Sequence, residues 1–109
     1  MKRTLLLVII VGFAAALSAR AADAKANWDS VCAKCHGADG KGQTKIGQML
    51  GIKDLTDAKV QAAMKDDAAF KVIKEGKKDP DGKVLMKAFD NLTDDEIKAL
   101  VAYVRAFKK

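Results

Sequence analysis

The chain holds two cysteines and one histidine, and all three lie within five consecutive residues, Cys32 to His36. Side chains three positions apart on a helical turn share one face, about 5–6 Å from each other. Such a C-x-x-C-H pattern is typical of c-type haem attachment, in which each thiol adds to one vinyl group and the imidazole binds the iron. The pattern therefore predicts one covalently bound haem c, with Cys32 and Cys35 as thioethers and His36 as an axial ligand.

Other uses of two neighbouring thiols fit the sequence less well. A thioredoxin-like dithiol requires a βαβ setting, and the sequence has no convincing alternating strand pattern. A structural zinc site requires four ligands, whereas the chain supplies only three such residues. A disulfide between Cys32 and Cys35 would close a very short loop and would add little stability.

A second axial ligand for the iron would come from a methionine. On spacing alone, Met49, Met64 and Met86 are all candidates. Methionine is usually core filler, and Met64 lies on the apolar face of a predicted short helix, where packing is its default role. Met49 lies in a glycine-rich loop near the attachment motif, and Met86 lies in a loop before the last helix. The residues themselves leave this choice open.

The rest of the sequence predicts helices joined by polar loops. The last helix is the best defined, because Thr93 and Glu96 form a T-x-x-E capping box and an apolar stripe follows. Five glycines between residues 37 and 51 predict an extended loop. The stripe consists of Ile97, Leu100, Val101, Val104 and Phe107. The other expected elements are a first helix over 22–34, a helix over 57–65 capped by Thr56, a helix over 67–75 stopped by Gly76, and a turn or loop over 77–83.

The first 21 residues have the features of a cleavable signal peptide. A short basic start precedes an apolar run over 5–17, and Ala19 and Ala21 stand at the spacing that signal peptidase reads. The run is too short for a bilayer span, which takes about 20 residues of helix. We therefore expect residues 1–21 to be removed, with cleavage after Ala24 as the alternative. Residues 22–109 are then expected to form one periplasmic domain that does not span the membrane.

The charge of the chain argues against binding to nucleic acid. The formal net charge is +6, and Lys2, Arg3 and Arg20 of the leader contribute to it, so the mature domain is only mildly basic. Aromatic residues make up 6% of the chain, too few for a base-stacking surface. A strong positive field and stacking platforms are the usual marks of nucleic-acid binders, and this chain has neither.

Two stretches together resemble the class I cytochrome c family, in its small bacterial periplasmic monohaem form. They are CAKCHGADGKG, residues 32–42, and MKAFDNLTDDEIKALVAYVR, residues 86–105. The resemblance covers nearly the whole mature chain. It implies an all-α, cytochrome c-like bundle of about four helices around one haem, with Met86 as the sixth ligand of the iron. It also implies that Trp28 on the first helix meets Tyr103 on the last helix beside the haem.

Three features depart from the pattern of this family. Lys87 follows Met86 where proline is common, so we expect this segment to be less rigid. Ala24 stands where a smaller residue, commonly glycine, lies at the helix crossing. Residues 37–51 contain no proline, so the carbonyl that usually orients the ligand histidine is not identified by the sequence.

The resemblance and the inferred ligands imply a soluble, monomeric one-electron carrier. Histidine and methionine would leave no vacant position on the iron, which argues against an enzyme. Its partners would be redox proteins: a donor dehydrogenase or cytochrome complex, and an acceptor oxidase or reductase. Two alternatives remain, a haem enzyme or gas or peroxide sensor with a labile sixth ligand, and a haem subunit of a larger oxidase or dehydrogenase.

Lysines near the inferred haem segments offer a docking rim for acidic partners. A merely solvated surface is the alternative, because lysine is spread throughout the chain. The lysines of this rim are Lys34, Lys41, Lys45, Lys83 and Lys87.

Overall fold

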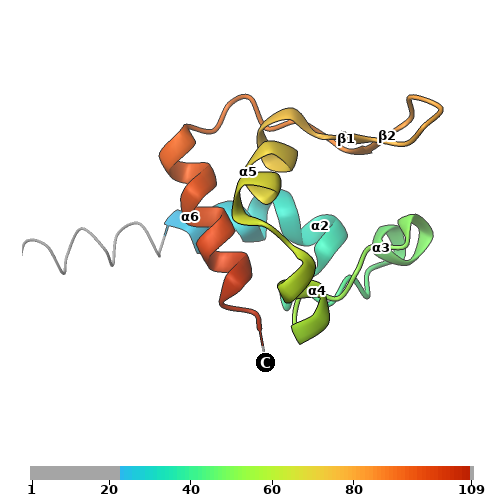
Figure 1. The fold of residues 1–109 in the computed structure, drawn as a ribbon, viewed down its shortest axis with the longest axis horizontal. Helices are drawn as coiled ribbons and strands as arrows, with labels where there is room; N and C mark the ends of the chain where they lie inside the picture. The colour runs from blue at the N-terminus through green and yellow to red at the C-terminus, as the bar shows by residue number, and fades with distance from the viewer. Residues whose placement is uncertain (1–22, 109) are drawn as a thin grey trace, which may run out of the picture.

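The computed structural model describes residues 23–108, so the predicted signal peptide, residues 1–21, lies outside the described residues. The described part is mostly helical, as predicted, with one small β-hairpin (Figure 1). In chain order, a helical turn over 23–27 is followed by η1 (Trp28–Cys32), α2 (Ala33–His36), α3 (Lys45–Leu50), α4 (Ala58–Ala63), α5 (Asp66–Glu75), β1 (Lys77–Lys78), β2 (Val84–Met86) and α6 (Asp94–Arg105).

The first helix runs without a break from residue 23 to His36, two residues beyond the predicted end. Its middle part, η1, is π-helical, and the N–H of Ala33 donates to the carbonyl of Trp28. Trp28 and Cys32 are the buried residues of this part. The helix ends at Gly37, whose φ of 85° is a conformation that glycine adopts readily.

The prediction of an extended loop over 37–51 is partly wrong, because α3 forms within it. Thr44 caps this helix by accepting a hydrogen bond from the N–H of Gly47, and Gly51 ends it in the left-handed conformation. The same local signals, a threonine before the helix and a glycine after it, also mark helix ends in general. The prediction of a loop rested on the glycine content of the stretch alone and did not use these signals.

The two helices that follow are close to the predicted ones. Asp57 caps α4, which is shorter than expected, and not Thr56 as predicted. The Thr56 hydroxyl instead donates to Asp54 Oδ1 over 2.6 Å. α5 begins one residue earlier than predicted, at Asp66, and ends at Gly76 as predicted.

The β-hairpin is a feature that the sequence analysis missed. β1 and β2 pair antiparallel, with Lys77 opposite Met86 and Lys78 opposite Val84. Met86 therefore lies on a strand and not in a loop, which corrects the expectation for this residue. In Figure 1 the hairpin extends to one side of the helices.

The last helix, α6, begins as the sequence predicts. Thr93 Oγ1 accepts from the N–H of Glu96, and Glu96 Oε1 accepts from the N–H of Thr93, which completes the capping box. The hydrogen bonds from Thr93 lower the pKa of Glu96. Phe107 lies beyond the end of α6, in a turn, and is half-buried. The predicted residues of the stripe that are buried on α6 are Ile97, Leu100, Val101 and Val104.

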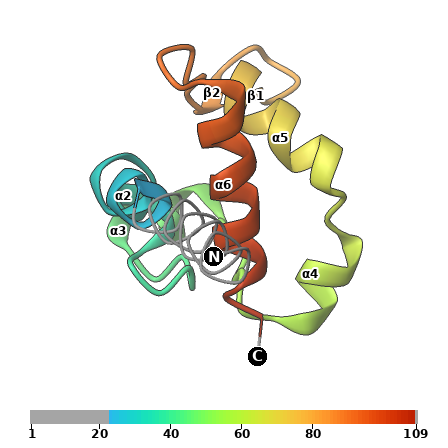
Figure 2. The same ribbon diagram turned by 90° about the vertical axis from the view of Figure 1, so that its left-hand side faces the viewer.

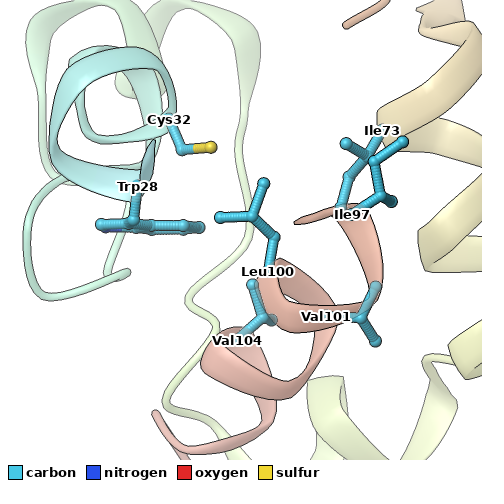
Figure 3. Packing of buried hydrophobic residues seen from close by; sticks show 7 residues of the cluster. All are labelled: Trp28, Cys32, Ile73, Ile97, Leu100, Val101 and Val104. Carbon is cyan, nitrogen blue, oxygen red and sulfur yellow. The ribbon is translucent and has the colours of Figure 1, made fainter. Parts of the chain in front are cut away.

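These residues of α6 hold the core together. α6 lies between the first helix and α5, as Figure 2 shows, and contributes buried side chains to one cluster with both. Figure 3 shows Trp28 and Cys32 on one side of Leu100, and Ile73 of α5 beside Ile97. The whole cluster is Trp28, Cys32, Ile73, Ile97, Leu100, Val101 and Val104.

A polar network fastens the junction of α4 and α5 to α6. The side chain of Gln61 is buried, and its Nε2 donates to the carbonyls of Leu55 and Val104 over 2.6 and 2.9 Å. Arg105 donates to the carbonyls of Gln61 and Met64 and to Asp66 Oδ1. The buried amide is thus satisfied, as buried polar groups generally are.

Replacing Thr93 by alanine should lower the free energy of unfolding by about 1 kcal/mol, because the N–H of Glu96 then loses its acceptor at the start of α6. Thermal unfolding followed by circular dichroism measures this change. Lys98→Ala, an exposed position on the same helix, serves as the control and should change stability by less than about 0.5 kcal/mol. Equal unfolding temperatures for the two variants would contradict the role of the cap.

Candidate functional site

The two cysteines lie on the C-terminal part of the first helix. Cys32 is buried (6% exposed) and belongs to the core cluster, whereas Cys35 is half-buried, and both thiols are free. The Sγ atom of Cys32 points from the helix toward Ile73 and Ile97 (Figure 3). Burial, together with the charge of Cys35, raises the pKa of the Cys32 thiol to about 11. This thiol therefore stays protonated at neutral pH, which disfavours oxidation to a disulfide.

The imidazole of His36 lies against the ring of Trp28, with 5.6 Å between the ring centroids. Its Nδ1 atom is buried, and within residues 23–108 no hydrogen-bond partner faces it. Burial lowers the pKa of His36, so the ring is neutral at pH 7. A neutral imidazole is the form that binds metals.

Backbone hydrogen bonds fix the end of the first helix. The N–H of Gly42 donates to the carbonyl of His36 over 2.7 Å, and Trp28 Nε1–H donates to the carbonyl of Gly37 over 3.0 Å. The Thr44 hydroxyl donates to the carbonyl of Cys35 over 2.6 Å. The loop and α3 thereby hold the attachment motif from one side.

Gly47 allows α3 to approach the attachment motif this closely. A Cβ atom at Gly47 would lie 2.6 Å from the carbonyl oxygen of Cys35 and 2.9 Å from Thr44 Oγ1. Sequence reasoning missed Thr44, Gly42 and Gly47 as supports of the site. For Gly42 and Gly47 the only signal was the glycine content of the stretch. This content does not indicate which backbone atoms a given glycine will contact.

Two further aromatic rings pack against Trp28 at the end of α6. Trp28 lies 5.7 Å from Tyr103 and 5.0 Å from Phe107, and the rings of Tyr103 and Phe107 meet edge to face. The expected contact between Trp28 and Tyr103 is therefore present. Ala24, one turn before Trp28, is also buried (3% exposed).

The three candidate methionines differ in their surroundings. Met49 is 76% exposed, so its position on α3 gives it little contact with the core. Met64 and Met86 are both half-buried and pack against the core cluster. The backbone carbonyl of Met64 is held by Arg105. Burial thus favours Met64 and Met86 over Met49 and does not choose between these two.

The lysines of the expected docking rim lie on two parts of the fold. Lys34 is on α2, Lys41 lies in the loop before α3, Lys45 is the first residue of α3, and Lys83 and Lys87 flank β2. Four of these five are exposed, and Lys41 is half-buried.

The residues of the site are chemically suited to a c-type haem. Two free thiols and a neutral imidazole occupy one short helical stretch, and a buried imidazole nitrogen has no protein partner among the described residues. Buried polar atoms without a partner are rare, and a metal or catalytic role is a usual reason for them. No group of three or more His, Cys, Asp or Glu side chains in residues 23–108 could hold a bare metal ion. In the same residues, no helix has the length and apolar character that a membrane span requires.

Comparison with known proteins agrees with this chemistry. The family model described as "Cytochrome C oxidase, cbb3-type, subunit III" matches residues 19–104. The structure of KustC0563, a c-type cytochrome, is similar to this chain with 38% sequence identity and a TM-score of 0.67, over 78% of this chain and 96% of that one.

A mutant of Kustc0563 gives a TM-score of 0.66 at the same identity, over 79% of this chain and 99% of that one. No curated protein matches the chain. Since the family model spans most of the 109 residues and the related structures agree in both fold and sequence, the chain belongs to this family and is a small c-type cytochrome, which implies a covalently bound haem c.

Proposed function

We propose that this cytochrome is a soluble periplasmic one-electron carrier with a single haem. Cys32 and Cys35 would hold the haem by thioether bonds, and His36 and Met86 would bind its iron from opposite sides. The observation that carries the proposal is the placement of two free thiols and a half-buried imidazole on one helical stretch beside the core, with the buried Nδ1 atom of His36 lacking a hydrogen-bond partner among residues 23–108.

When bound, the haem supplies reversible exchange of one electron between Fe(III) and Fe(II). The protein residues around the haem would set its reduction potential and shield it from water. The thioether of Met86 favours the reduced state, which raises the reduction potential relative to two histidines. The apolar cluster around Cys32 keeps water away, and burial keeps His36 neutral and ready to act as a ligand.

The same ligands argue for a carrier and against an enzyme. With His36 and Met86 both in place, substrates such as peroxide or nitric oxide would find no vacant position on the iron. A sensor or enzyme would require Met86 to leave readily. We therefore propose that this chain carries electrons and is not an enzyme.

One observation favours a second candidate, a haem subunit of a larger oxidase. The matching family model is described as subunit III of a cbb3-type oxidase. The electron-transfer chemistry would be the same in either case, and the difference would lie in assembly. Size-exclusion chromatography of the native protein from its own cell envelope distinguishes the two, because a free carrier elutes at the size of one small domain.

A potentiometric titration of the purified haem protein tests the carrier function. We expect one reversible transition that fits one electron per chain, identical in the oxidative and reductive directions. Steady turnover of hydrogen peroxide at a rate typical of enzymes, about 1–1,000 per second, would contradict the proposal.

We expect electron transfer to an acidic redox partner to slow as salt is added. The lysines beside β2 would attract such a partner, and salt screens this attraction because the Debye length falls from about 10 Å at 0.1 M to about 3 Å at 1 M. Stopped-flow rates at several ionic strengths measure the effect. The double variant Lys83→Glu/Lys87→Glu should react more slowly at low salt and depend less on salt.

The control is Lys59→Glu, an exposed lysine on α4. It carries one charge reversal and not two, so the rates are compared per charge changed. If Lys59→Glu slows the reaction as much per charge as the variant at Lys83 and Lys87, the lysines form no specific rim and act only through the net charge.

A further inference from the structure

The segment that carries Met86 folds back onto the C-terminal end of α5 at Gly76. Gly76 has a φ of 80°, and a Cβ atom placed on it would lie 2.6 Å from the carbonyl oxygen of Met86 and 2.9 Å from the amide nitrogen of Ala88. Cβ atoms in proteins essentially never lie within 3.0 Å of another residue's oxygen or nitrogen atom, so both distances are too short. Both of the atoms concerned belong to the backbone, so neither can rotate away as a side chain would. Only glycine allows this approach.

Two further backbone contacts hold the same segment. Met86 pairs with Lys77, the residue after Gly76, in the small sheet. The N–H of Phe89 donates to the carbonyl of Ile73 over 3.0 Å. Because Ile73 is buried in the core cluster, this bond ties the segment after Met86 directly to the core. Backbone contacts thus join Met86 to β1 and the segment after it to α5.

The far end of the hairpin is closed by one side chain. Asp79 Oδ1 accepts from the N–H groups of Asp81 and Lys83 over 3.0 and 2.9 Å, and the N–H of Asp79 donates to the carbonyl of Lys83 over 2.9 Å. These bonds fix the turn between β1 and β2. The closed turn therefore fixes how β1 and β2 pair, with Lys77 opposite Met86.

We propose that Gly76 is a positioning residue, which lets the Met86–Ala88 backbone lie against the end of α5 so that the hairpin directs the Met86 side chain to the haem iron. This inference rests on the proposed role of Met86 as the axial ligand. Gly76 touches the backbone of the ligand segment and not the iron, so its effect acts through Met86.

Imidazole binding to the ferric protein tests the proposal, because added imidazole and Met86 compete for the same position on the iron. If Gly76→Ala displaces the segment, Met86 competes less well and imidazole binds at least about tenfold more tightly than to the wild type. A variant that only destabilises the fold lowers the melting temperature without changing this affinity at low temperature.

Gly51→Ala is the matched control. Gly51 also ends a helix with a positive φ, but a Cβ atom there meets nothing within 4 Å. We expect Gly51→Ala to bind imidazole with wild-type affinity. Met86→Ala sets the upper limit, since it removes the competing ligand altogether.

The outcomes separate this inference from the proposed function. If Met86→Ala tightens imidazole binding and Gly76→Ala leaves it at the wild-type value, the role of Gly76 is wrong and Met86 remains the ligand. If Met86→Ala itself leaves imidazole affinity unchanged, the proposed ligand is wrong, and the inference fails with it.

A second pair of variants decides the matter if Gly76→Ala yields no haem protein. Asp79→Ala removes the acceptor that closes the exposed turn, and it should tighten imidazole binding by a smaller factor, about threefold. Asp79→Asn keeps a side-chain oxygen at the same place and should restore wild-type affinity. Wild-type affinity in Asp79→Ala would overturn the proposal that the hairpin positions Met86.

Discussion

Replacing Met86 by alanine should remove the weak red charge-transfer band that methionine sulfur gives to ferric haem. It should also lower the reduction potential by a substantial share of the roughly 0.8 V range that axial ligands span in haem proteins. The physical reason is that a soft thioether stabilises Fe(II) relative to Fe(III). Absorption spectra of the oxidised protein and a potentiometric titration measure the two effects.

Met64→Ala is the control for this variant. Met64 is also half-buried and packs against the same core cluster, so its loss removes a similar amount of apolar contact. It should keep the red band and change the potential little. If Met64→Ala abolishes the band and Met86→Ala leaves it intact, the axial ligand is Met64, and the role given to the hairpin is wrong.

Removing both thiols in Cys32→Ala/Cys35→Ala should leave a chain without covalent haem that has lost most of its cooperative folding. Cys32 is part of the core cluster, so the haem it anchors would lie against the main apolar contacts of the domain. A domain this small buries a modest core. A group bound only by the native state adds its binding free energy to folding, about 4 kcal/mol for a ligand at 1,000 times its Kd.

Far-ultraviolet circular dichroism during thermal unfolding measures this loss. Val31→Ala is the control on the same helix, because Val31 lies next to Cys32 and is 38% exposed. This variant should keep its haem and a sharp unfolding transition. A helical double-cysteine variant that unfolds cooperatively near the wild-type temperature would show that the polypeptide folds without its haem.

Features of the fold set by neighbouring residues could be predicted from the sequence. The capping box of Thr93 and Glu96 involves groups three residues apart, and it is present as predicted. The apolar stripe on α6 follows the helical period, and its residues Ile97 and Leu100 are the most deeply buried in the described part of the chain. The family was also predicted correctly, because the attachment motif is short and specific.

Features that depend on contacts between distant residues could not be predicted in this way. Gly76 was expected to stop α5, which it does, but its close approach to Met86 requires knowing where the chain returns. The same is true of Gly47 and the carbonyl of Cys35. The sequence shows where a glycine stands, but it does not show which distant atom packs against its Cα atom.

The hairpin shows a different reason for a missed element. Its strands are two and three residues long, too short for an alternating pattern to be recognised. The side chain of Asp79 stabilises it, together with a glycine at φ 87° in the turn. The prediction of a turn or loop over 77–83 is right only for its middle part, because Lys77 and Lys78 form β1. The pairing that follows from the turn brings Met86 into a strand.

Lys87 illustrates how the structure changes the interpretation of one residue. Lysine in place of the more common proline led us to expect a less rigid segment after Met86. The segment is nevertheless held by pairing with Lys77 and by the bond from Phe89 to Ile73. Backbone contacts to β1 and α5 constrain this segment where the sequence suggested freedom.

The central claim is that side chains of this chain occupy both axial positions of the iron. The absorption spectrum of the reduced protein, recorded before and after carbon monoxide is added, tests it most directly. We predict that the spectrum stays unchanged in the wild type, because His36 and Met86 leave no position for the gas, whereas Met86→Ala binds it at once. A wild-type spectrum that shifts immediately on addition of carbon monoxide would contradict the claim and would favour a sensor or an enzyme.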